Sequence, residues 1–136
     1  QRGFFMTWLS RFQPQLLALL RITAAYMYFW HGTAKFFGYP TAMGHVELLS
    51  LMGAAGVLEI GGGLLLMLGL FTRPVAFLLS GQMAVAYFMA HSQPSMWMPL
   101  LNKGEPAALF CFIFLSLAAA GGGAPSLDGL LRRKRA

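Results

Sequence analysis

The sequence contains little charge. Asp, Glu, Lys and Arg make up 10% of its 136 residues, whereas hydrophobic residues make up 57%. A water-soluble domain carries roughly a quarter charged residues. The mean hydropathy is +0.62, and residues 74–102 and 106–127 contain none of the four charged residue types. Because a transmembrane helix needs about 20 mainly apolar residues, the composition excludes an ordinary soluble domain and predicts an integral membrane protein.

Cysteine and acidic residues are also scarce. The single Cys111 cannot close an intrachain disulfide, and no Cys/His spacing is typical of a zinc site, so we expect no bound metal. The net charge of +6 could indicate nucleic-acid binding. However, four of the basic residues form the run 132–135 behind an apolar segment, where a cytoplasmic membrane flank is basic. We therefore expect a lipid bilayer as partner, and no nucleic acid.

Four apolar segments predict an all-α fold, an integral membrane bundle of four transmembrane helices. The predicted spans are residues 14–37, 46–71, 74–90 and 105–120. Pro14 suits the first turn of a helix, whereas Gly38 and the glycine run 121–123 suit helix C-termini. Aromatic residues between Arg2 and Arg11 predict a short interfacial helix at the N-terminus.

The distribution of basic residues predicts how the bundle is oriented. With four spans, both termini and the loop between the second and third spans share one side. That side holds Arg2, Arg11, Arg73 and the run 132–135, and the other side holds Lys35 and Lys103. Since cytoplasmic flanks are enriched in Lys and Arg, both termini are predicted to be cytoplasmic.

A few ionisable residues interrupt the predicted spans. Such a residue costs about 2.5 to 3.5 kcal/mol at the bilayer centre on insertion scales, so it normally faces the bundle interior. On the first span, polar residues recur at helical spacing: Arg21, Tyr28, His31 and Lys35. Glu59 lies near the middle of the second span, among small residues that let a neighbouring helix approach. We predict that Glu59 pairs with the first span, through Arg21, Tyr28 or His31.

A second polar group is predicted at the extracytoplasmic end of the bundle. Its members are His31, Lys35, His91, Asn102 and Glu105. Simpler explanations stay open: an ion pair of Glu59 with Arg21 could only fix helix register, Lys35 could snorkel to the interface, and His91 could be solvated. Haem ligation is disfavoured, because His31 and His91 are predicted near one surface and no deeper histidine pair exists.

Several motifs carry a family likeness. They are His31 to Gly38, Gly56 to Leu66, Gly69 to Pro74, Asn102 to Glu105 and Ser126 to Asp128. Together they resemble the DoxX family of small bacterial membrane proteins, in order over residues 21–128. The resemblance implies a single DoxX-like transmembrane domain over residues 1–136 and a place in the bacterial inner membrane. Family names refer to small subunits of a terminal quinol oxidase and of thiosulfate:quinone oxidoreductases, which implies a redox setting and no single reaction.

Residues and resemblance together predict a small accessory subunit of a respiratory or redox complex that contacts quinone or quinol. The candidate polar or quinone-site residues are Arg21, Tyr28, His31, Lys35, Glu59, His91 and Glu105. No flavin, iron–sulfur or nucleotide motif is recognisable. We therefore expect other membrane redox subunits to carry the electrons, and no catalysis by this chain alone. The alternative is a non-catalytic membrane scaffold or assembly factor, and a proton or solute conductor ranks third.

Overall fold

The computed structural model describes residues 2–41, 47–91 and 93–135. Within these ranges the chain forms helices and no strand, which confirms the all-α class. The helices are α1 (Arg2–Ser10), α2 (Gln13–Phe37), α3 (Leu51–Leu68), α4 (Thr72–Ala90), α5 (Pro99–Asn102), α6 (Glu105–Ala120) and α7 (Leu127–Arg135). Helices α2, α3, α4 and α6 occupy the four apolar segments, and α1 is the short N-terminal helix.

The ends of α3 differ from the predicted ones for local reasons. The helix begins at Leu51, because Ser50 caps it: the Ser50 side chain accepts a hydrogen bond from the Gly53 N–H at 3.0 Å. It ends at Leu68, because Gly69 adopts the left-handed conformation with φ of 72°. The predicted start at residue 46 lies outside the described residues.

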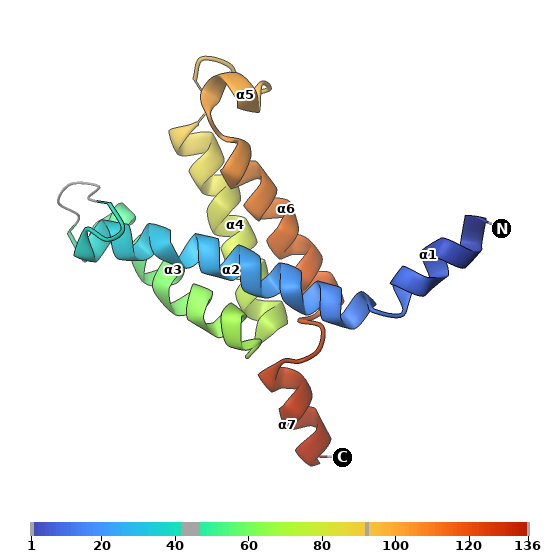
Figure 1. Ribbon diagram of the computed structural model, residues 1–136. Helices are drawn as coiled ribbons and strands as arrows, with labels where there is room; N and C mark the ends of the chain where they lie inside the picture. The colour runs from blue at the N-terminus through green and yellow to red at the C-terminus, as the bar shows by residue number, and fades with distance from the viewer. Residues whose placement is uncertain (1, 42–46, 92, 136) are drawn as a thin grey trace.

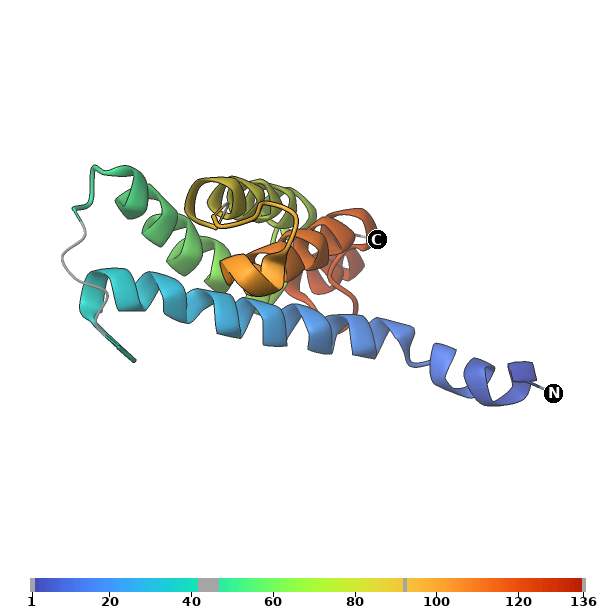
Figure 2. The ribbon, with the colours of Figure 1, turned by 90° about the horizontal axis from the view of Figure 1, so that it is seen from above.

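The four long helices form two hairpins (Figure 1). Helix α2 packs along α3, and α4 packs along α6, while the hairpins meet chiefly through α3 and α4. The view from above shows the long α2 running beside the other three (Figure 2). In Figure 1, the hairpin of α2 and α3 extends to the left, and the hairpin of α4 and α6 extends to the top, where α5 lies. The hairpins therefore diverge at one end.

The core between the hairpins is apolar. Its fully buried members include Tyr28 from α2, Leu66 from α3, Leu79 from α4 and Phe114 from α6. The Tyr28 and Phe114 rings meet edge to face, with centroids 5.1 Å apart. Small residues allow the close approach predicted around Glu59, since Gly56, Gly62 and Gly63 are all buried.

At the other end of the bundle, three chain segments meet. The Ala124 N–H donates to the carbonyl of Pro14 at 3.0 Å, and the Asp128 N–H donates to the carbonyl of Gly69 at 2.9 Å. The start of α2, the turn between α3 and α4, and the segment after α6 thus lie together. Both ends of the chain leave the bundle from this end (Figure 1).

Asp128 caps α4 from the start of α7. Its two carboxylate oxygens accept hydrogen bonds from the N–H groups of Phe71 and Thr72, each at 2.8 Å. Burial alone would raise the pKa of the Asp128 carboxyl. The hydrogen bonds from Thr72 and Phe71 and the charge of Arg132 outweigh burial, so this pKa lies below its ordinary value.

Replacing Asp128 with Asn is expected to lower the free energy of unfolding by about 1 kcal/mol at neutral pH. Since the folded pKa is depressed, the cap contributes stability above the ordinary pKa of 3.8, and this stability is lost as the pH falls through the folded pKa. Thermal melts in detergent over an acid pH series measure both effects. The matched control is Glu47→Gln, at an exposed carboxylate. If Asp128→Asn and Glu47→Gln change the melting temperature equally, then Asp128 does not stabilise the start of α4.

Helix α7 is absent from the sequence prediction. The run 132–135 was expected as a membrane flank directly behind the last apolar helix, but it lies on α7, separated from α6 by residues 121–126. Ser126 starts α7, since its hydroxyl accepts a hydrogen bond from the Gly129 N–H at 3.0 Å.

By length and composition, one helix in the described ranges could cross a membrane, namely α3 (Leu51–Leu68). Helix α6 is apolar but shorter. Large apolar side chains nevertheless face outward on other helices: Leu19 is 60%, Phe77 is 66% and Phe112 is 67% exposed. A soluble protein rarely leaves so many large apolar side chains uncovered.

Candidate functional site

A cavity of about 450 Å³ lies between the diverging ends of the two hairpins. Its polar lining consists of Tyr28, His31, Lys35, Glu59, Gln82, His91 and Lys103. Its apolar lining includes Met52, Met83, Pro106 and Phe110. All four long helices contribute to it. Apolar walls with a few converging polar groups are typical of a small-molecule site.

A buried ion pair lines this cavity. The Lys35 Nζ lies 2.6 Å from the Glu59 Oε1, and the two side chains are only 7% and 4% exposed. The prediction that Glu59 pairs with Arg21, Tyr28 or His31 is therefore wrong. Helical side chains lean toward the N-terminus of their helix, so the long Lys35 side chain reaches back along α2 to Glu59. Nor does Lys35 snorkel to the interface.

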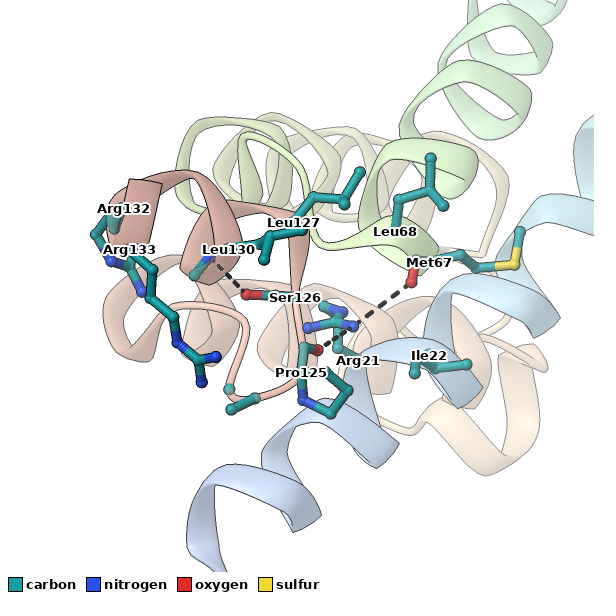
Figure 3. Close-up of a pocket in the computed structure, with 13 residues that line it drawn as sticks. Arg21, Ile22, Met67, Leu68, Pro125, Ser126, Leu127, Leu130, Arg132 and Arg133 are labelled. Carbon is teal, nitrogen blue, oxygen red and sulfur yellow. Dashed lines mark hydrogen bonds between the residues drawn. The ribbon is translucent and has the colours of Figure 1, made fainter. Parts of the chain in front are cut away.

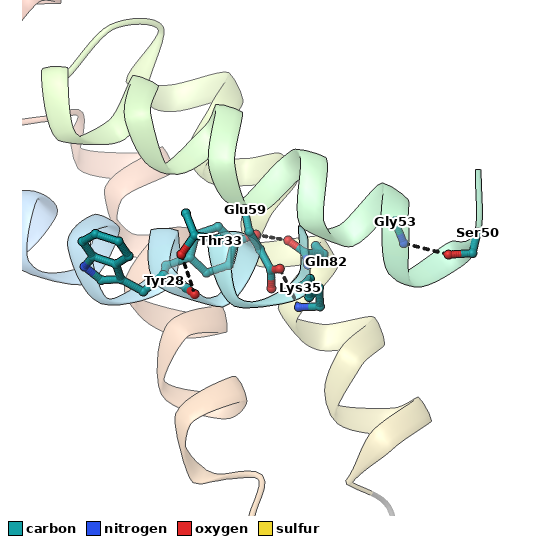
Figure 4. Close-up of polar contacts among 8 residues, drawn as sticks. Tyr28, Thr33, Lys35, Ser50, Gly53, Glu59 and Gln82 are labelled. Carbon is teal, nitrogen blue, oxygen red and sulfur yellow. Dashed lines mark hydrogen bonds and ion pairs between the residues drawn. The ribbon is translucent and has the colours of Figure 1, made fainter. Parts of the chain in front are cut away.

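Tyr28 and Gln82 form a second polar contact in the cavity. The Tyr28 hydroxyl donates a hydrogen bond to the Gln82 Oε1, joining α2 to α4. Figure 4 shows this pair and the Lys35–Glu59 pair between the helices. Sequence reasoning missed Gln82, although a lone amide within the apolar segment 74–90 was a usable signal.

Two of the three histidines, His31 and His91, line the cavity. His31 is exposed and meets the edge of the Phe110 ring, with centroids 6.4 Å apart. The His91 Nδ1 lies 3.1 Å from the Asn102 carbonyl oxygen. The structure therefore brings His31, Lys35 and His91 to one cavity.

Asn102 and Glu105 do not line this cavity. The buried Asn102 side chain holds the loop together, because its Nδ2 donates to the Tyr87 hydroxyl at 3.0 Å and to the Ser95 carbonyl at 2.7 Å. Glu105 is exposed and lines a different groove, beside Leu20. The prediction of one polar cluster is wrong for Glu105, and Asn102 contacts the cluster only through its backbone carbonyl, at His91.

Arg21 lies at the opposite end of the bundle. Its guanidinium donates hydrogen bonds to three backbone carbonyls: that of Gly122, that of Met67 at 3.5 Å and that of Pro125 at 3.0 Å. Two of these contacts are drawn in Figure 3. Arg21 thus joins the end of α3 to the segment after α6, and it has no part in the cavity.

The cavity groups suit hydrogen bonding and proton exchange with a small ring-shaped molecule. They supply a phenol, two ammonium groups, a carboxylate, an amide and two imidazoles, together with the Phe110 ring. In the described part of the chain, no three His, Cys, Asp or Glu side chains gather as a metal-binding group.

Outward apolar side chains around a buried ion pair define a small helical membrane protein. The chain belongs to the DoxX family, which matches over residues 16–92. An uncharacterized protein of Haemophilus influenzae is 45% identical over 132 residues, which cover 93% of this chain and 98% of that protein. Inner membrane protein YqjF of Escherichia coli is 30% identical over 131 residues, which cover 88% of each. No solved structure gives a significant match. The resemblance seen in the sequence is thereby confirmed.

Proposed function

We propose that this chain is a small subunit of a respiratory or redox complex in the bacterial inner membrane, and that its cavity binds the headgroup of a quinone or quinol. The observation that carries the proposal is the Lys35–Glu59 pair, buried at 2.6 Å yet lining a cavity of about 450 Å³. A pair that only fixed helix register would be packed on every side. Here both charges border a space that a ligand can enter.

The proposed setting is a bilayer crossed by α2, α3, α4 and α6, with both termini in the cytoplasm. Three observations support this setting: the outward apolar side chains, the basic run 132–135 near the C-terminus and the membership of the DoxX family. The printed name of YqjF supports the inner membrane. In this orientation the cavity opens toward the extracytoplasmic half of the bilayer, within reach of a membrane-dissolved quinone.

The cavity residues match what quinone chemistry requires. A quinone carbonyl needs a hydrogen-bond donor or a cation, which Tyr28 and Lys35 supply. Oxidation of a quinol to the quinone releases two protons and two electrons, and the proposed proton acceptors are Glu59 and His31. The electrons pass to a redox-active partner subunit. The chain is proposed to bind and orient the quinone and not to catalyse its oxidation alone.

The test is to purify the full chain from its native membrane in mild detergent, and to quantify co-purifying subunits and extractable quinone by mass spectrometry. Recovery of a redox subunit with stoichiometric quinone is expected. Recovery of partner subunits without quinone would instead support the scaffold or assembly factor.

Filling the cavity is expected to remove the quinone. Ala55 lines the cavity, whereas its neighbour Ala54 is exposed and does not. Ala55→Phe should lower quinone content about tenfold, since overpacking of this kind costs about 1 to 3 kcal/mol. Ala54→Phe adds the same side chain one position away and should retain the quinone. Equal retention by both variants would place the quinone outside this cavity.

A further inference from the structure

A second pocket, of about 750 Å³, lies at the terminal end of the bundle. It is formed where α7 and the segment before it approach α2 and the end of α3. Three arginines line it, namely Arg21, Arg132 and Arg133, beside apolar side chains that include Ile22, Leu68 and Leu130. No acidic side chain of the described residues lines this pocket.

Arg21 contributes a fixed positive charge to the pocket. Its side chain is 1% exposed, its hydrogen bonds go to backbone carbonyls, and its Nε has no hydrogen-bond partner among the described residues. Asp128 is the carboxylate that acts electrostatically on both Arg21 and Arg132, and it offsets only one of the three arginine charges at the pocket. The pocket therefore keeps an excess of positive charge.

The cationic and apolar parts of the pocket lie side by side. In Figure 3, Arg132 and Arg133 lie on one side, Leu68 and Ile22 on the other, and Arg21 between them. Leu68 is 54% and Ile22 is 39% exposed, so the apolar side continues onto the outer surface of α2 and α3. A free anion would need only the arginines. A molecule with an anionic head and an apolar chain matches both parts.

We propose that this pocket binds the headgroup phosphate of an anionic phospholipid, with an acyl chain along Ile22 and Leu68. The bound lipid holds α7 against the bundle in the leaflet nearest the termini. This site is separate from the cavity between the hairpins, and the proposal does not depend on quinone binding.

The experiment measures lipid binding to the detergent-solubilised full chain by native mass spectrometry. Phosphatidylglycerol is expected to bind about tenfold more tightly than phosphatidylcholine with the same acyl chains, since each basic residue near a lipid surface adds about 1 kcal/mol. The double variant Arg132→Gln/Arg133→Gln should remove most of this preference. Its control, Arg11→Gln/Lys134→Gln, removes the same charge from residues outside the pocket.

Two results would overturn the proposal. If both double variants lose the preference for phosphatidylglycerol over phosphatidylcholine equally, that preference depends only on the net charge of the protein and not on this pocket. Competition by inorganic phosphate as effective as that by phosphatidylglycerol would identify a soluble-anion site in place of a lipid site. Quinone content should stay unchanged in both double variants. The result of the lipid experiment is therefore independent of the result of the quinone experiment.

Discussion

Glu59→Gln is expected to abolish quinol-linked electron transfer in the assembled complex and to destabilise the purified protein strongly. The substitution removes the negative charge that lies 2.6 Å from the buried Lys35 ammonium. Removing one member of a buried ion pair costs about 3 to 5 kcal/mol. It also removes the proposed proton acceptor from the cavity. Thermal melts in detergent, quinone extraction and the electron-transfer rate measure these effects.

Two further variants separate function from stability. The double variant Lys35→Met/Glu59→Leu removes both charges, and such replacements of buried pairs are often neutral or stabilising. It should recover stability and still lack quinone. Glu105→Gln makes the same change at an exposed carboxylate outside the cavity and should leave both properties unchanged. If the Glu59→Gln complex assembles with unchanged activity, the quinone role is wrong, and an effect on stability or complex yield alone supports the scaffold.

Helix positions could be predicted from the sequence because the breaks between apolar segments are chemically explicit. Gly38, with φ of 66°, ends α2 as predicted, and Gly121, with φ of 86°, ends α6. Each of these glycines ends its helix through its own backbone conformation, which does not depend on how the helices pack against one another. Helix α7 was missed because its basic run also fits a membrane flank, and Ser126 shows its capping role only once α7 is known.

The partner of Glu59 could not be predicted because spacing assigns a residue to a helix face but not to a depth. Lys35 lies near the end of α2, yet its flexible side chain reaches a carboxylate near the middle of α3. The Lys35 and Glu59 side chains are buried as an interior position requires, whereas His31 on the same stripe of α2 is exposed. The three partners offered for Glu59, namely Arg21, Tyr28 and His31, did not include Lys35.

The position of Glu105 shows a limit that arises for the apolar helices of a membrane protein. Lipid is as apolar as the protein interior, so hydrophobic periodicity does not reveal which face of a helix is buried. On α6, Phe114 is fully buried and Phe112 is 67% exposed, although both are phenylalanine. The rotation of α6 about its axis, and with it the direction of Glu105, was therefore hidden from sequence reasoning.

Gly32→Ala is expected to separate α2 from α3 and to disturb the cavity. A Cβ at Gly32 would lie 2.7 Å from the Ile60 Cγ1, 2.8 Å from the Gly56 carbonyl oxygen and 3.0 Å from the Glu59 Cβ. A backbone oxygen in a helix cannot turn aside as a side chain can, so the helices must shift. Such overpacking costs about 1 to 3 kcal/mol. Because the clash includes Glu59, quinone content should fall together with the melting temperature.

Gly61→Ala is the matched control on α3. A Cβ at Gly61 meets no atom within 4 Å, and alanine favours a helix over glycine by up to about 1 kcal/mol. The control should therefore keep its quinone and melt at the same temperature or higher. Thermal melts and quinone extraction of the two purified variants measure the difference. If Gly32→Ala behaves like Gly61→Ala, then α2 and α3 do not pack closely against each other at Gly32. A contact between α2 and α3 other than the one at Gly32 would then have to hold Glu59 at the cavity.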